Sequence, residues 1–162
     1  MMVRTLLAAI ALGLAASPGA AAAPNVGVAV SDSTLSLANG QTLNFSDLRG
    51  QVVVLSYWMN DCKACEAQMT ALDHYYRLRR DVGLVVLAVP VEELSDRQLK
   101  RAFKGKMVHP VSRIRGPFEM LGGLPTTYVV DRTGQIRYAS SGMLDTEQLN
   151  RILVPLLRQP QP

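Results

Sequence analysis

The stretch QVVVLSYWMNDCKACEAQMTALDHYY, residues 51–76, joins a predicted buried strand to a predicted amphipathic helix. Residues 51–58 form a continuous β-branched and apolar run, which is typical of a strand covered on both faces. From Cys62 to about Arg80 the period changes to that of one helix face, shared by Cys65, Met69, Leu72 and Tyr76. Asn60 or Asp61 is the expected N-cap of this helix.

Both cysteines of the chain, Cys62 and Cys65, lie at the junction of these two elements. A disulfide between them would close a loop of about four residues and remove little entropy from the unfolded chain, so it is a poor staple. Covalent haem attachment needs a histidine at position 66, which is Glu66. Structural zinc needs about four ligands, but His74 and His109 are far apart in sequence. The remaining interpretation of the two cysteines is a redox couple.

The position of the pair supplies a mechanism for disulfide exchange. The start of a helix favours an anion, so it stabilises a thiolate at Cys62. Cys65, one turn further along, is expected to face the core and to resolve mixed disulfides formed by Cys62. Lys63 favours the thiolate, whereas Asp61 and Glu66 oppose it. The expected cofactor is therefore none beyond this redox-active disulfide, and no metal is expected.

Further elements follow from local patterns along the rest of the chain. They are a hairpin (34–37 and 42–45) turning at Asn39-Gly40, a strand (84–91), a helix (95–105), a loop (109–116), a short helix (117–121), two strands within 122–142 and a last helix (145–159). Together they predict an α/β fold with a central mixed β-sheet, helices on both faces and an N-terminal β-hairpin.

The composition describes an ordinary folded chain of one domain. Of the 162 residues, 48% are hydrophobic and 19% are charged, which argues against disorder. The formal net charge of +4 is too small to indicate a nucleic-acid partner.

The N-terminal residues are typical of a secretory signal. Arg4 precedes an apolar run over residues 5–16, and small residues suggest cleavage after Ala22 or Ala23. The run is shorter than the roughly 20 apolar residues of a spanning helix, which makes a retained membrane anchor the weaker alternative. We therefore expect a periplasmic or otherwise exported protein. Its predicted parts are a signal peptide (1–23), a lead-in segment (24–33), one domain (34–157) and a Pro-rich tail (158–162).

The stretch LRGQVVVLSYWMNDCKACEAQMTALDHYY, the hairpin before it and GGLPTTYVVDRTGQI after it resemble the thioredoxin-like superfamily. Within it, the chain is most similar to exported TlpA/ResA-type thiol–disulfide oxidoreductases, over roughly residues 34–157. The resemblance implies that Trp58 supports the site and that Pro125 follows a cis peptide bond and lies against the disulfide. It also implies that the backbone of Leu124 pairs with an extended substrate segment.

Several positions depart from the family pattern. Ala64 replaces a common proline between the cysteines, and Thr70 replaces a later one. Gln68 replaces a common glutamate, and Ser56 corresponds to the buried acid of thioredoxin.

A proton relay therefore has few candidates in this sequence. Gln68 stands in the family's acidic position, and Glu92 or Glu93, just past the strand at 84–91, could substitute for the missing acids. The alternative for both glutamates is an ordinary position in a solvent-exposed loop.

The expected function is thiol–disulfide oxidoreductase activity through the Cys62-Lys-Ala-Cys65 couple. The expected partners are exported proteins bearing a disulfide or thiol pair, and an upstream thiol–disulfide electron donor. The resemblance favours a protein that reduces disulfides in cytochrome c or copper-site maturation. The residues between the cysteines do not exclude the opposite direction, in which the protein oxidises thiols. One alternative is a Cu(I)-binding module, because Met59 and Met69 flank the cysteines. A second alternative is a redox-inert binding domain.

Overall fold

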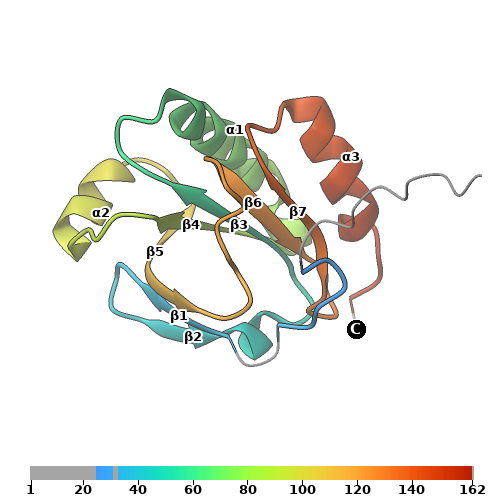
Figure 1. Ribbon diagram of the computed structural model, residues 1–162. Coiled ribbons are helices and arrows are strands. Elements are labelled where there is room, and N and C mark those ends of the chain that lie inside the picture. The colour runs from blue at the N-terminus through green and yellow to red at the C-terminus, as the bar shows by residue number, and fades with distance from the viewer. Residues whose placement is uncertain (1–24, 31–32, 162) are drawn as a thin grey trace, which may run out of the picture.

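The computed structural model describes residues 25–30 and 33–161, which form a seven-stranded sheet with helices packed on it (Figure 1). The strands are β1 (Thr34–Leu37), β2 (Thr42–Asn44), β3 (Val52–Trp58), β4 (Leu84–Pro90), β5 (His109–Arg115), β6 (Thr126–Val130) and β7 (Ile136–Ser141). The helices are η1 (Phe45–Leu48), α1 (Lys63–Arg79), η2 (Arg80–Val82), α2 (Asp96–Ala102) and α3 (Thr146–Leu157).

The sheet is mixed, as predicted, with the strand order β2-β1-β5-β4-β3-β6-β7. The three central strands β3, β4 and β5 run parallel, because α1 and α2 each return the chain to the same edge. The remaining pairs, β2-β1, β1-β5, β3-β6 and β6-β7, are antiparallel. Every residue of β3 is buried, as expected for a strand in the middle of such a sheet.

Two hydrophobic cores lie on the two faces of the sheet. Helices α1, α2 and α3 enclose the first core, with Leu72 and Leu153 fully buried against β3 and β4. The 3-10 helix η1 and the loop between β5 and β6 cover the second core through Phe45, Leu48 and Phe118. The expected α/β thioredoxin-like fold with an N-terminal hairpin is thus confirmed, with a 3-10 helix as the helical cover of the second face.

Residues His109–Arg115 form a strand, so the prediction of 109–116 as a loop was wrong. β5 pairs with β4 on one side and with β1 on the other, so it joins the hairpin to the central sheet. Its sequence does not predict a strand, because Pro110 and two exposed arginines interrupt the apolar pattern and only Val111 is buried. The neighbouring strands, rather than its own periodicity, hold it in the sheet.

The short helix expected at 117–121 is absent from the described structure, which has an irregular loop there. The Tyr57 hydroxyl donates to the Phe118 carbonyl at 2.8 Å, and the Tyr128 hydroxyl donates to the Glu119 carbonyl at 2.6 Å. These carbonyls are bound by side chains from β3 and β6 instead of accepting bonds within a helical turn. Burial, and to a smaller extent Tyr128, raises the pKa of Tyr57 to about 12, so its hydroxyl remains a donor at neutral pH.

The predicted signal peptide lies outside the described residues. Part of the predicted lead-in segment does join the sheet, because Ala29 bridges to Gln135 and the Gly27 N–H donates to the Ile136 carbonyl at 2.8 Å. Within the described residues, no helix is both long and apolar enough to cross a membrane.

Candidate active site

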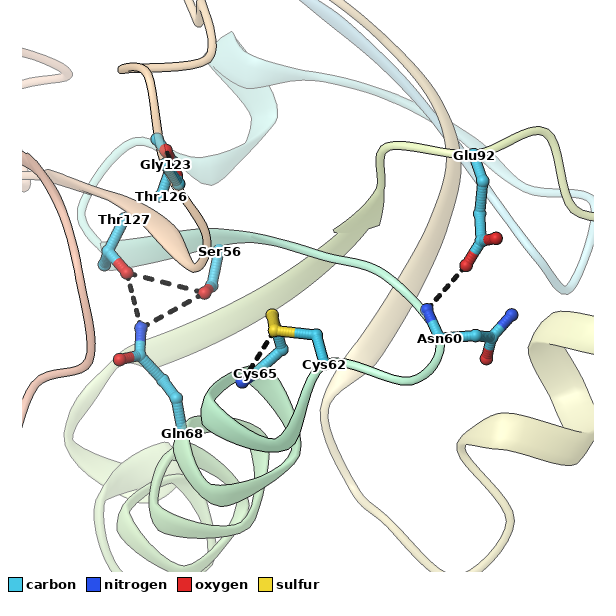
Figure 2. The surroundings of a disulfide bond; sticks show 9 residues. All are labelled: Ser56, Asn60, Cys62, Cys65, Gln68, Glu92, Gly123, Thr126 and Thr127. Atoms are coloured by element: carbon cyan, nitrogen blue, oxygen red, sulfur yellow. Dashed lines mark hydrogen bonds between the residues drawn. A yellow bond between two sulfur atoms is a disulfide. The ribbon is translucent and has the colours of Figure 1, made fainter.

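The two cysteines form a disulfide at the start of α1 (Figure 2). Cys62 itself is the N-cap of α1, so the expectation of Asn60 or Asp61 in that position was wrong. Asp61 has a left-handed backbone, with φ +59°, which turns the chain so that Cys62 enters the helix in an extended conformation. The Cys62 sulfur accepts a hydrogen bond from the Cys65 N–H at 3.1 Å.

The two sulfurs differ in their access to solvent. Cys62 is half-buried, whereas Cys65 is only 1% exposed and belongs to the core under α1. A cleft of about 540 Å³ opens beside the pair, and the exposed side chain of Lys63 lies on its rim. An incoming sulfur can therefore approach Cys62, whereas Cys65, which also lines the cleft, is almost completely covered.

Aromatic and apolar side chains from distant parts of the chain form the walls of this cleft. Trp58, at the end of β3, packs edge-to-face on Phe103, with ring centroids 4.9 Å apart. Trp58 is buried, and its indole N–H has no hydrogen-bond partner among the described residues. Met69 contributes to the same cleft, and Lys106, just past α2, adds a second cation.

The segment before β6 contains the cis peptide bond that the resemblance implied. The Leu124–Pro125 peptide bond is cis, Pro125 is buried and Leu124 is half-buried against both cores. Among the hydrogen bonds of the described residues, none uses the backbone N–H or carbonyl of Leu124. In the view of Figure 2, Gly123 and Thr126, which flank this pair, lie above Thr127 and Ser56.

Behind the disulfide lies an uncharged hydrogen-bond network, shown in Figure 2. The Gln68 amide nitrogen donates to the Thr127 hydroxyl at 2.5 Å and to the Ser56 hydroxyl at 3.3 Å. The Gln68 amide oxygen accepts from the Leu144 N–H at 2.7 Å. All three side chains are fully buried, with 0% exposure. Position 68, expected among the proton-handling groups, is thus a buried hub that carries no titratable group.

The two glutamates named from the sequence take different positions. A carboxylate oxygen of Glu92 accepts the Asn60 backbone N–H at 2.6 Å, which ties the end of β4 to the loop before Cys62. Glu93 is exposed, and both glutamates line a second groove on the side of β4 and β5. In the view of Figure 2, Glu92 and Gln68 lie on opposite sides of the disulfide.

Sequence reasoning missed the partners that complete the site. Thr127 could have been noticed, because a Thr-Thr pair after Pro125 is unusual in a fully buried strand. Leu144 takes part through its backbone, and Phe103 and Lys106 approach only through the placement of α2. None of these three has a local sequence signal.

The chain is similar in sequence to known proteins. Residues 26–139 match the model of the AhpC/TSA family. The thiol-disulfide oxidoreductase ResA of Geobacillus kaustophilus (strain HTA426) is 29% identical over 133 residues, which cover 79% of this chain and 76% of that protein.

Two solved structures share the fold. A thiol-disulfide isomerase from Corynebacterium glutamicum superposes with a TM-score of 0.66 at 20% identity, covering 83% of this chain and 98% of that one. The pneumococcal exposed lipoprotein thioredoxin (Etrx1) from Streptococcus pneumoniae strain TIGR4 gives a TM-score of 0.59 at 23% identity, covering 76% and 98%.

Proposed function

Because the chain belongs to the AhpC/TSA family and is a thioredoxin-like thiol–disulfide oxidoreductase, we propose that it reduces disulfides in exported proteins through Cys62 and Cys65. In this proposal Cys62 is the attacking sulfur and Cys65 the resolving one. The observation that carries the assignment is the contrast between a half-buried Cys62 at the helix N-cap and a Cys65 that is 1% exposed.

The reduced protein attacks first through Cys62. Its thiolate, favoured by the N–H groups of the first turn of α1, attacks one sulfur of a substrate disulfide, and the other substrate sulfur leaves as a thiol. The Cys65 sulfur then attacks the Cys62 sulfur, which breaks the mixed disulfide and releases the second substrate thiol. The product is the Cys62–Cys65 disulfide seen here. A dithiol donor must reduce it again, with the two electrons and two protons passing from the donor to the cysteines.

The approach of the substrate chain is proposed to use the segment before Pro125. The unpaired backbone groups of Leu124 can hydrogen-bond an extended segment of the substrate beside the disulfide. A substrate side chain next to the reacting cysteine would then enter the cleft that Trp58 and Phe103 line.

Two cysteine variants test the roles of the sulfurs. Cys62→Ser should abolish reduction of a disulfide substrate in the presence of dithiothreitol, because no attacking sulfur remains. Cys65→Ser should accumulate mixed disulfides with natural partners, detected on non-reducing gels after acid quenching of cells. A Cys65→Ser protein that carries no cross-linked partner would contradict the exchange mechanism, and an inactive wild type would favour the redox-inert alternative.

The direction of exchange and the partners are the finer part of the proposal. We propose a reductant that acts outside the cytoplasm on the cysteine pair of apo-cytochrome c or of a copper site, supplied by an upstream thiol–disulfide donor. A redox titration in glutathione buffers tests the direction. A midpoint of about −270 mV supports a reductant, and one of about −120 mV supports an oxidant.

Cu(I) handling is a second candidate, favoured by the placement of Met59. This side chain is 40% exposed and lines the same cleft as both cysteines. Thiolate and thioether sulfurs together suit Cu(I). Equilibrium dialysis of the reduced protein tests this candidate. One bound copper per chain, lost in Cys62→Ser and weakened in Met59→Leu but not in Met143→Leu, would support it, and equal retention in Met59→Leu would exclude the thioether.

A further inference from the structure

The Gln68 network fixes the orientation of its central amide. The Leu144 N–H can only donate, so the amide oxygen of Gln68 must face it, and the amide nitrogen must face the hydroxyls of Ser56 and Thr127. The two hydroxyl oxygens also lie 3.4 Å from each other. The network therefore satisfies its buried polar groups without a charge.

Gln68 connects the disulfide helix to three other parts of the site. Ser56 belongs to β3, which leads into the Cys62 loop, and Thr127 belongs to β6, two residues after Pro125. Leu144 lies between β7 and α3, next to the exposed Met143. The resolving cysteine is one turn before Gln68 on α1. A single side chain thus ties α1, three residues after the resolving cysteine, to two strands and a loop.

The charged groups near the pair all lie outside this network. Asp61, Lys63 and Glu66, at the start of α1, line the cleft, and so does Lys106, after the end of α2. Glu92 is bound to the Asn60 N–H on the other side of the disulfide. On the side of β3, β6 and Leu144, the groups that face Gln68 are hydroxyls and a backbone amide.

We propose that Gln68 is a positioning residue, which holds the turn of α1 that carries Cys65 in place beneath Cys62 through an uncharged network. Because this network offers no acid or base, the proton of Cys65 leaves toward the cleft and not into the interior. This inference rests on the proposed exchange through Cys62. In the resolving step the Cys65 proton passes to water in the cleft, and the Cys65 sulfur bonds to the Cys62 sulfur. The bond from Cys62 to the substrate breaks, and the departing thiolate takes a proton from water.

The test measures how fast a preformed mixed disulfide between Cys62 and glutathione resolves from pH 5 to 9. For the wild type we expect one ionisation, with the rate rising about tenfold per pH unit on the acid side, because only the thiol titrates. Gln68→Glu should add a second ionisation. Above it, the rate should exceed that of the wild type on the order of 10²-fold, because the new carboxylate accepts the proton internally.

Gln68→Glu is suited to the site because a carboxylate can accept from the Leu144 N–H and from both hydroxyls, which rotate freely. Gln159→Glu, at an exposed position after α3, adds the same charge elsewhere and should leave the profile unchanged. Gln68→Met keeps the size of the side chain but not its bonds. We expect it to resolve about tenfold more slowly with a single ionisation, as a loss of positioning requires.

Two results would overturn the inference. A second ionisation in the wild type would mean that an acid serves Cys65, and wild-type resolution rates in Gln68→Met would remove the positioning role. Failure of the wild type to form the mixed disulfide at Cys62 would instead contradict the proposed function, so the two failures are distinguishable.

Discussion

Asp61, directly before the attacking cysteine, has a left-handed backbone conformation and a negatively charged side chain. Its left-handed conformation, φ +59°, is one that aspartate and asparagine adopt more readily than other residues with a Cβ. Its carboxylate is exposed, on the rim of the same cleft, where it opposes a thiolate at Cys62. Asparagine would keep the conformation and remove the charge.

We therefore expect Asp61→Asn to make Cys62 more reactive. Two like charges about 5 Å apart in water repel by about 0.8 kcal/mol, which corresponds to about a fourfold larger thiolate fraction. The check is the rate constant for alkylation of the reduced protein by iodoacetamide, measured on the acid side of its pH dependence. Because Cys65 is 1% exposed, the fast phase reports Cys62. Asp81→Asn, at an exposed site beyond α1, serves as the control, and an equal or slower rate in Asp61→Asn would contradict the repulsion.

At the scale of elements, the sequence predicts those parts whose pattern is local. The apolar stripe of α1, the buried run of β3 and the turn at 131–134 each depend on neighbours in sequence, and all three are confirmed. β5 and the loop at 117–121 depend on partners far along the chain. Their local patterns therefore predicted the wrong structure, a loop for β5 and a helix for the loop. The same division holds at the site. The disulfide follows from its motif, whereas the bond from Gln68 to Leu144 joins residues 76 positions apart.

Asp73 shows what a buried polar residue on the core face of α1 does. One of its oxygens accepts from the Met107 N–H at 2.5 Å and the Val108 N–H at 3.3 Å, and the other accepts from Arg77 at 2.8 Å. Burial raises the pKa of the Asp73 carboxyl, but the bonds from Arg77 and the two backbone amides more than offset this and hold it below 3.8. The side chain thereby fastens α1 to the chain that enters β5.

Asp73→Asn should remove an acid-sensitive part of the stability. Because the folded pKa is depressed, the contribution of Asp73 is complete above its unfolded pKa and is lost as the pH falls through the folded value. We expect the variant to be about 1–2 kcal/mol less stable than the wild type at pH 7. The difference should shrink as the pH falls past the unfolded pKa of aspartate and through the lower pKa of Asp73 in the folded protein. Urea unfolding at several pH values checks this, with Glu147→Gln, in an exposed ion pair on α3, as the control. A difference that stays constant with pH would contradict the assignment.

At the scale of the whole molecule, Arg132 joins three elements at the end of the sheet opposite the disulfide. Its side chain, in a residue that is 3% exposed, donates to the carbonyls of Gly50 before β3, Val82 at the end of η2 and Leu157 at the end of α3. The distances are 2.9 Å to Val82 and 3.0 Å to Leu157. The planar guanidinium can reach several carbonyls at once, and its positive charge complements the C-terminal end of α3.

Arg132→Met should therefore lower global stability and spare the chemistry. It leaves three carbonyls without their buried donor, and we expect a loss of about 2–4 kcal/mol in the free energy of unfolding. Arg132→Lys should recover little of that loss, because one ammonium cannot reproduce the fork. Arg151→Met, at an exposed position on α3, should change stability by less than about 1 kcal/mol. The folded Arg132→Met protein should keep the wild-type rate of disulfide exchange, because Gly50 and Cys62 lie at opposite ends of β3. Slower exchange at full folding would mean that strain at this end of the sheet reaches the cysteines.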